Sequence, residues 1–512
     1  MTSGASGQTA NEPAVLVVGA GPTGLALALC LARSGIAVRL VDRAAQPATT
    51  SRAIGIQART LELLDLFGLA EELVALGLRA VAGNIHAGSN RLVHLDLSRI
   101  RSRFPYILLL EQTETERILT EALARCGVSV ERGVEVVGFK HDSSSVQVQL
   151  SKNGAAPTAA SYDYMVGCDG AHSITRHGLA VGFTGKTLHQ KFLLADLDVE
   201  WKLPDDQFHI FTSPEGLMAV FPMRQGHRLI AETREEPADS VSGRSLSQLE
   251  TVTRRAAVKM KLSNLRWSSF FHVNSRLATK LRDGRVLLAG DAAHIHSPAG
   301  AQGMNTGIQD AINLGWKLAF VLRGDAAAEL IDTYEIERYP VERGVLRNTE
   351  MLTRMVSLRA SVLRRARDLI VPPVARTEFV QKMARNTISE IGISYRRARA
   401  SALSGLADGD RIPDLEIEPD HEGRTRLYSV LDGVRFTLLV VSKNESGIMP
   451  GIAASIPDRI ARVIFARRVL GDVPRDLSDW FCLIRPDAYI ALQGPLTQAA
   501  DAVDWLGALA TK

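Results

Sequence analysis

The chain has 512 residues, of which 46% are hydrophobic and 23% are charged. This length exceeds what a single hydrophobic core usually organises, so we expect a globular protein of two or three domains. The formal net charge of only +4 argues against a nucleic-acid-binding surface. The four cysteines lie far apart without a C-x-x-C pair, which argues against a disulfide framework or a structural zinc site and fits the cytoplasm.

The first residues, 1–13, are mostly small and polar and lack the basic and apolar regions of a signal peptide, so we expect a disordered lead. The apolar run Val15–Ala32 contains a Gly-Ala-Gly-Pro sequence. We therefore interpret this run as a buried strand and helix rather than as a membrane span, and we expect no membrane partner.

The stretch from Ala14 to Asp42 predicts a nucleotide-binding unit. A β-branched strand precedes a G-x-G-x-x-G turn, and a helix and a second strand follow, the second strand ending in Asp42. The turn consists of Gly19, Ala20, Gly21, Pro22, Thr23 and Gly24. Its first glycine permits the sharp turn, its second lets the backbone approach a pyrophosphate, and its third lets helix and strand pack closely. Phosphates would lie at the helix N-terminus, with Asp42 on an adenosine ribose, but the motif does not distinguish FAD from NAD(P).

Two arginines beyond this unit have more than one interpretation. Arg52 and Arg59 are either ordinary surface residues or cations that reach the pyrophosphate or a second, phosphorylated ligand. We favour the surface interpretation for Arg59 and leave that of Arg52 open.

The middle of the chain alternates between nucleotide-domain elements and strands of another sheet. Apolar and polar residues alternate over 84–110, which predicts strands that leave the nucleotide-binding domain. A further strand ends in Asp169-Gly170, and residues 181–280 predict a sheet of short strands. Such a sheet can cover an apolar ligand, although packing on a core explains its apolar side chains equally well.

A second glycine-rich stretch begins about 270 residues after the first. A strand ends in Gly290-Asp291, and a turn that contains Pro298 leads into a long helix through Gly303, Met304 and Asn305. Two helix N-termini suit one extended ligand, with a pyrophosphate at the first and a polar ring edge at the second, and a flavin dinucleotide has this shape. The alternative is a loop with a structural role alone.

We predict no metal site in this stretch. His294 and His296 are close in sequence, but no carboxylate or cysteine stands near them at metal-ligand spacing.

The C-terminal part predicts helices and then a small α/β domain. Residues 330–400 are helical and arginine-rich, which we interpret as solvated or interdomain helix faces. The composition changes near residue 400, and we place a domain boundary there. The predicted elements of the tail are strands at 426–431, 436–441 and 480–485, and helices at 458–469 and 496–509.

Together the three motifs resemble the class A flavoprotein monooxygenases, the aromatic-ring hydroxylases related to p-hydroxybenzoate hydroxylase. The resemblance covers about residues 14–345, and the tail resembles the thioredoxin-like domain of the phenol, pentachlorophenol and aromatic-polyketide hydroxylase branch. The implied fold class is α/β. A Rossmann-like FAD-binding domain (14–180 and 281–400) is interleaved with a β-sheet substrate domain (181–280, with strands from 84–110), and a thioredoxin-like domain follows (401–512). The tail has only Cys482 and no C-x-x-C, which excludes dithiol exchange.

The resemblance implies which residues bind FAD. Pro298, Gly303, Met304 and Asn305 would line the flavin ring, and their backbone amides would stabilise the reduced flavin. The full set expected to bind FAD is Gly19, Gly21, Pro22, Thr23, Gly24, Asp42, Arg43, Arg52, Gln112, Asp169, Gly170, Gly290, Asp291, Gly303, Met304 and Asn305.

The resemblance also implies the reaction. NAD(P)H, with NADPH favoured, would reduce FAD, and O₂ would add to it as a C4a-hydroperoxide that hydroxylates a phenolic or polyketide-like aromatic substrate. Such an intermediate requires an enclosed apolar pocket. Ile210, Phe221 and Met223 are our candidates for its wall, and Arg228 for a phenolate partner. The alternatives are an FAD-dependent oxidase or dehydrogenase on the same fold and a non-catalytic flavin-binding homologue. We expect a monomer or homodimer.

Overall fold

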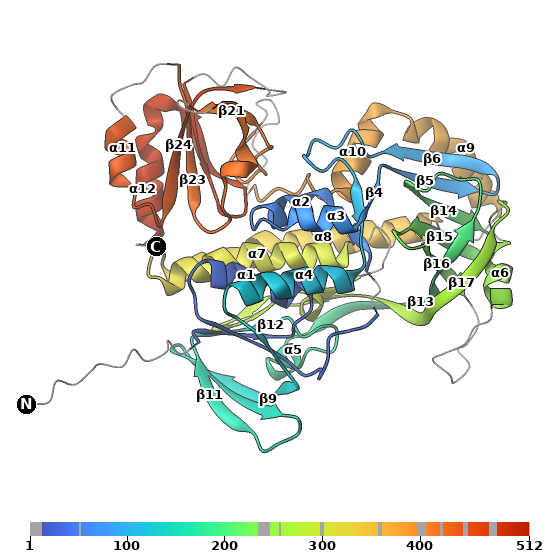
Figure 1. Ribbon diagram of the computed structural model, residues 1–512, viewed down its shortest axis with the longest axis horizontal. Coiled ribbons are helices and arrows are strands. Elements are labelled where there is room, and N and C mark those ends of the chain that lie inside the picture. The colour runs from blue at the N-terminus through green and yellow to red at the C-terminus, as the bar shows by residue number, and fades with distance from the viewer. Residues whose placement is uncertain are drawn as a thin grey trace, which may run out of the picture.

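The computed structural model describes residues 13–50, 53–233, 246–254, 256, 258–296, 302–356, 361–396, 406–419, 423–443, 449–470 and 479–510. The predicted lead, apart from Pro13, lies outside these residues. Figure 1 shows a large body in blue to yellow, a β-sheet extending to one side of it, and the C-terminal domain in orange and red on its other side. In the described part of the chain, no helix is long and apolar enough to cross a membrane.

The nucleotide-binding domain is built on a six-stranded sheet with the strand order β18-β19-β12-β1-β2-β8. β1 lies between β12 and β2 and is parallel to both. All four of its residues are buried, as expected for a parallel strand that is covered on both faces. The strands are β1 (Val15–Val18), β2 (Val38–Asp42), β8 (Val130–Arg132), β12 (Tyr164–Gly167), β18 (Arg282–Asp283) and β19 (Val286–Leu288).

The side chains of β1 alternate between two cores. Val15 and Val17 pack with three helices, and Leu16 and Val18 pack against a three-stranded antiparallel sheet. Figure 1 shows the helices above the central sheet and the small sheet below it. The helices are α1 (Pro22–Arg33), α4 (Gln112–Arg125) and α7 (Gly303–Leu322), and the small sheet consists of β9 (Val134–His141), β10 (Val146–Lys152) and β11 (Thr158–Tyr162).

A second sheet forms the predicted substrate domain and has the order β20-β17-β13-β16-β15-β14-β5-β6. One face packs against α6 (Leu246–Thr253), while Ile210 and Phe221 pack against the core that contains the nucleotide-binding helices. Strands from 82–96 enter this sheet, as the alternation predicted. The strands are β5 (Ala82–Ala87), β6 (Asn90–Asp96), β13 (Phe183–Glu200), β14 (Gln207–Ser213), β15 (Gly216–Pro222), β16 (His227–Thr233), β17 (Lys261–Ala278) and β20 (His294–Ile295).

Shorter elements connect these parts. A three-stranded sheet comprises β3 (Gly55–Ile56), β7 (Ile107–Leu109) and β4 (Leu78–Ala80). The connecting helices are α2 (Ala58–Asp65), α3 (Ala70–Leu76) and α5 (Ile174–Gly178). The predicted helical region contains α8 (Asp332–Val356), α9 (Ser361–Ala375) and α10 (Glu378–Ile388), and α9 and α10 pack beside β6.

The C-terminal domain contains a sheet of order β22-β21-β24-β23-β25-β26. β23 and β24 are parallel and flank α11 in the chain, and β25 and β26 continue the sheet antiparallel before α12. The strand order β24-β23-β25-β26, with β24 parallel and β25 antiparallel to β23, is that of a thioredoxin-like sheet. Its elements are β21 (Glu416–Pro419), β22 (Thr425–Arg426), β23 (Phe436–Val441), α11 (Met449–Ser455), β24 (Ala461–Leu470), β25 (Trp480–Ile484), β26 (Ile490–Pro495) and α12 (Ala500–Leu509).

Two predictions for this domain are wrong. The segment 458–469, predicted as a helix, contains most of β24, because its Val and Ile side chains pack in the sheet interior beside β23. The segment 426–431, predicted as a strand, contains a short 3₁₀ turn at Leu427–Val430, with Leu427 and Tyr428 buried.

Candidate active site

The first glycine turn leaves room for a ligand at the N-terminus of α1. A Cβ atom on Gly19, whose φ is +101°, would lie 2.4 Å from the carbonyl oxygen of Cys168. A Cβ on Gly24 would lie 1.9 Å from the carbonyl oxygen of Gly19, whereas one on Gly21 would meet nothing within 4 Å. The first and third glycines therefore serve close packing, and the second faces open space where a pyrophosphate can reach the helix N-terminus. The residues present fit a dinucleotide.

Asp42 lies against the same turn, at the end of β2. Its Oδ2 accepts a hydrogen bond from the Ala20 amide (2.7 Å), and its Oδ1 accepts one from the Ala44 amide (2.8 Å). Arg132 lies 3.6 Å from Oδ2. The carboxylate is thus held beside the nucleotide turn, and its contact with a ribose stays a prediction.

The three motifs meet at this point of the fold. A Cβ on Gly19 would lie 2.9 Å from the Cα of Asp169, and one on Gly290 would lie 2.5 Å from Oγ1 of Thr23 in α1. A Cβ on Gly307, in the second turn of α7, would lie 2.3 Å from the same oxygen. Segments about 150 and 270 residues downstream of the glycine turn are therefore in direct contact with it.

Asp169 has one engaged and one unengaged carboxylate oxygen. Its Oδ2 accepts hydrogen bonds from the backbone N–H (3.0 Å) and the hydroxyl (3.1 Å) of Thr175. Its Oδ1 is buried and has no hydrogen-bond partner among the described residues. Gly170, at φ +78°, borders open space. A buried, unpaired carboxylate oxygen next to open backbone fits a polar ligand atom, because leaving it unpaired is costly.

The second helix N-terminus is held by buried polar contacts. Asp291 is exposed and belongs to the turn after β19, and Gly303, Met304 and Asn305 form the first turn of α7. The Asn305 side chain accepts a hydrogen bond from the Gln57 amide and donates one to the Gly55 carbonyl, each at 2.8 Å. Asn305 therefore ties α7 to β3, a role that the sequence pattern did not reveal. Pro298 and Arg52 lie outside the described residues.

The remaining predicted cofactor residues lie on several different elements. Arg43 is exposed, immediately after Asp42. Gln112 is the first residue of α4, and its Nε2 donates to Oε1 of Glu116 at 2.7 Å. Pro22 and Thr23 form the first turn of α1. The flavin contacts of these residues stay predictions.

Arg228 has a partner within the protein. Its guanidinium forms two hydrogen bonds with the carboxylate of Asp196, its neighbour on β13, at 2.7 and 2.6 Å, and both side chains are buried. Because moving a paired, buried arginine leaves a costly unpaired carboxylate, Asp196 fixes the position of Arg228, and contact of Arg228 with a substrate stays a prediction. The apolar candidates lie nearby, where Phe221 stacks on Phe208 at a ring separation of 5.5 Å and Met223 is buried.

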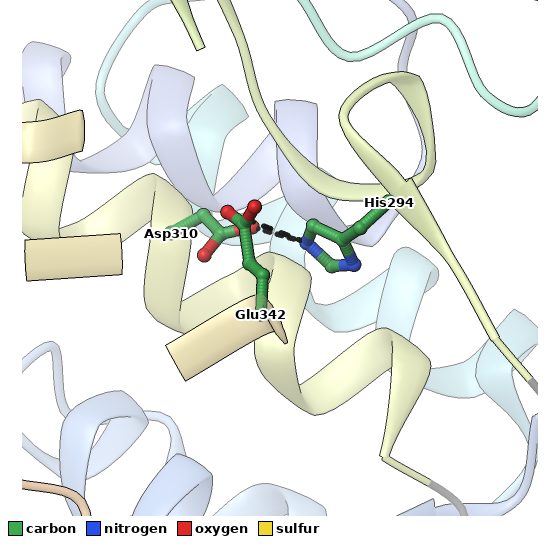
Figure 2. Close-up of side chains that lie close together, drawn as sticks. All are labelled: His294, Asp310 and Glu342. Carbon is green, nitrogen blue, oxygen red and sulfur yellow. Dashed lines mark hydrogen bonds and ion pairs between the residues drawn. The ribbon is translucent and has the colours of Figure 1, made fainter. Parts of the chain in front are cut away.

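Figure 2 shows a buried cluster of His294, Asp310 and Glu342 next to the second turn. Nε2 of His294 lies 2.7 Å from Oδ2 of Asp310, which also accepts a hydrogen bond from the Gly290 amide (3.2 Å). Oδ1 of Asp310 accepts from Nε of Arg338 at 2.7 Å. These residue types can bind a metal ion, and they lie close enough together to do so. However, Asp310 already accepts hydrogen bonds on both oxygens, and Arg338 supplies the balancing positive charge, so we interpret the cluster as an ion-pair network.

The pKa values of the network's members are shifted. Burial lowers the pKa of His294, but the carboxylates of Glu342 and Asp310 outweigh it and raise the value to about 9. Burial raises the pKa of Glu342 to about 8. The cluster has no sequence signature, because its residues come from β20, α7 and α8.

Two family models match the chain, the FAD binding domain over residues 12–349 and the C-terminal domain of aromatic-ring hydroxylases over 406–510. The chain belongs to the class A FAD-dependent aromatic hydroxylases. It is 34% identical to 6-methylpretetramide 4-monooxygenase of Streptomyces rimosus over 95% of this chain and 91% of that protein. It is 32% identical to pentachlorophenol 4-monooxygenase of Sphingobium chlorophenolicum, with 98% of each chain covered. The solved structure of the anhydrotetracycline hydroxylase OxyS from Streptomyces rimosus has a TM-score of 0.79, 32% identity, and covers 96% of this chain and 97% of its own.

These matches confirm the fold class and the predicted family, and they establish the protein as an FAD-dependent aromatic monooxygenase. The cofactor is FAD. The domain boundaries and the individual site residues stay predictions.

Proposed function

We propose that this protein hydroxylates a phenolic or polycyclic aromatic compound, with NAD(P)H as the reductant and O₂ as the oxidant. The observation that carries the proposal is the contact of the glycine turn, Asp169 and Gly290 at the N-terminus of α1. Relatives named for tetracycline-type and chlorinated phenol substrates, which the chain matches nearly end to end, support the substrate class. NADPH is our preferred reductant.

The residues of this chain bind and orient the reactants. FAD, when bound, supplies the electron transfer and the activation of O₂. The α1 N-terminus and Asp42 would hold its adenosine diphosphate half, and Asp291 with the first turn of α7 would hold the flavin half. Ile210, Phe221 and Met223, on or beside the sheet that packs against this core, would cover the substrate and exclude water.

The direct test is turnover by the purified protein. We expect NADPH oxidation that a substrate from a panel of phenols and polycyclic phenols stimulates, and a product that carries one additional oxygen atom by mass spectrometry. NAD(P)H consumption matched by hydrogen peroxide, without an oxygenated product from any member of the panel, would indicate an oxidase and contradict the proposal.

Asp291→Ala should weaken FAD binding. Asp291 is exposed in the turn next to Gly290, and a charged hydrogen-bond acceptor contributes on the order of 1.5–3 kcal/mol, so we expect the FAD Kd to rise about tenfold or more. The measurement is titration of the apoprotein with FAD, followed by flavin fluorescence. The matched control is Asp504→Ala, which removes an exposed carboxylate from α12. Unchanged FAD affinity in Asp291→Ala would refute this assignment.

A further inference from the structure

The turn that contains Gly290 and Asp291 is supported from behind by α7. Oδ2 of Asp310 accepts hydrogen bonds from the Gly290 amide (3.2 Å) and from His294 (2.7 Å), so one carboxylate fixes both ends of the turn. Asp310 is fully buried. A shift of Asp310 would therefore move the backbone that precedes Asp291.

Arg338 of α8 holds Asp310 in place and extends the contact to a residue beyond α10. Its Nε donates to Oδ1 of Asp310 (2.7 Å), its Nη2 to the Thr306 carbonyl in the first part of α7 (3.3 Å), and its Nη1 to the Tyr395 hydroxyl (3.1 Å). The planar guanidinium fixes these three partners at once. Arg338 has no exposed surface.

Tyr395 contacts the C-terminal domain through its aromatic ring. Its ring packs on that of Tyr489 at a centroid separation of 4.1 Å, and Tyr489 lies in the turn between β25 and β26. The Arg485 guanidinium lies 5.3 Å from the ring of Tyr395 and 5.7 Å from that of Tyr489. Cations over aromatic faces are attracted to the ring electrons, so this stack is held together by Arg485.

The same turn completes a second set of buried ion pairs. Arg485 binds Glu337, the neighbour of Arg338 on α8, through two hydrogen bonds of 2.6 and 2.9 Å. Glu337 also accepts from Lys317 of α7 at 2.8 Å, and Asp487 accepts from Asn313 of α7 at 3.2 Å. Burial lowers the pKa of Lys317 to about 8. Without Arg485, the carboxylate of Glu337 would lose its bidentate partner in a buried environment, where unpaired charge is costly.

We propose that the turn Arg485–Tyr489 of the C-terminal domain is part of the flavin-binding machinery. Through Tyr395 and Arg338 it positions Asp310, and through Asp310 the Gly290–Asp291 turn. Arg485, Tyr395 and Arg338 are positioning residues, since none of them belongs to the predicted flavin contacts. The inference rests on the proposed binding of FAD at this turn, and it assigns the thioredoxin-like domain a function in cofactor retention that needs no cysteine chemistry.

Two tyrosine variants of the full-length protein provide a matched test. Tyr395→Phe removes the hydroxyl that accepts from Arg338, whereas Tyr339→Phe removes a partly exposed hydroxyl on α8 that lies outside the proposed pathway. We expect Tyr395→Phe to raise the FAD Kd about three- to tenfold and to shift the flavin midpoint potential and the visible flavin spectrum, because a buried hydrogen bond to a charged group is lost. Tyr339→Phe should stay within about twofold of the wild type on the FAD Kd, with an unchanged spectrum.

Arg485→Gln is the stronger variant. It should raise the FAD Kd by about tenfold or more and lower the melting temperature of the apoprotein. If this variant does not fold, the tyrosine pair decides alone. Equal FAD affinity, potential and spectrum in the two phenylalanine variants would overturn the inference and leave the proposed function intact, whereas a wild-type protein that takes up no FAD would overturn both.

Discussion

Thr23 is the residue at which two distant glycines contact the first helix. Cβ atoms on Gly290 and Gly307 would lie 2.5 and 2.3 Å from its hydroxyl oxygen, far inside van der Waals contact. The glycine spacing in the sequence predicted the turn before α1, because that turn is a local property of the backbone. It could not predict the contact with Gly307, which depends on how α7 packs on α1.

Gly307→Ala should therefore destabilise the apoprotein. Forcing a methyl group into a packed interface costs about 1–3 kcal/mol, more than the gain of roughly 0.5–1 kcal/mol from replacing a helical glycine by alanine. Urea unfolding measures the difference. Gly344→Ala on α8, where a Cβ meets nothing within 4 Å, is the control and should be neutral or stabilising. Adding Thr23→Ala to Gly307→Ala should restore part of the loss, and a Gly307→Ala protein as stable as the wild type would contradict the packing argument.

The buried position of Arg59 could not be predicted from the sequence. We interpreted it as a surface residue, and the structure shows it fully buried, with hydrogen bonds to Glu62 (3.1 Å), the Tyr428 hydroxyl (3.1 Å) and the Asp487 carbonyl (2.6 Å). Arginine is rarely buried without partners, and two of these partners are more than 360 residues away in sequence. No local pattern could identify them.

At the scale of elements, the hydrophobic periodicity identified the strands of the nucleotide-binding sheet and of the substrate sheet. It failed over 458–469, which we predicted as a helix. In β24 partly exposed and buried positions alternate from Val463 to Ala466, and the arginines that follow lie at the exposed end of the strand. Helix and strand patterns overlap in so short a segment, and the parallel pairing with β23 decides the outcome.

The substrate sheet should lose stability in acid. Burial and the neighbouring His86 lower the pKa of His209 on β14 to about 4, and the pKa of His86 is also lowered, mainly by burial. The unfolded chain binds a proton on His209 more tightly than the folded chain does. The free energy of unfolding should therefore fall as the pH decreases from about 6.5 towards 4. Urea unfolding between pH 7 and about pH 4.5 should show this decline. His209→Phe should flatten it, whereas His177→Gln, which alters an exposed histidine, should leave the slope unchanged.

At the scale of the whole molecule, the C-terminal domain is joined to the rest by a buried interface. Trp316 and Phe320 of α7 pack edge to face on Phe436 of β23, at ring separations of 5.5 and 5.3 Å. Composition and motifs predicted the domain and its boundary near residue 400. They gave no sign of this interface, because its residues look like ordinary core positions in each part separately.

Arg59→Met should weaken the contact between the C-terminal domain and the rest of the protein, because Arg59 of α2 binds Tyr428 and Asp487 of that domain. Among the described residues, the substitution leaves the carboxylate of Glu62 with Arg411 as its one charged partner, and it removes the hydrogen bond to the Asp487 carbonyl. Loss of one partner of a buried pair costs about 3–5 kcal/mol. Unfolding in urea, followed by tryptophan fluorescence, measures the loss. Arg125→Met, at an exposed position of α4, should have little effect. A loss no greater than that of the control would show that the interface does not depend on Arg59.

The meeting of distant segments at the N-terminus of α1 also fixes when the protein can acquire its cofactor during synthesis. The nucleotide turn leaves the ribosome early, but its pocket has no second wall until Gly290 and Asp310 have been made. If the turn at Tyr489 supports that wall, another 200 or so residues must follow, which takes on the order of 10–40 s at ordinary translation rates. The growing chain must therefore remain soluble through most of its synthesis without the stabilisation that bound FAD provides to the finished protein.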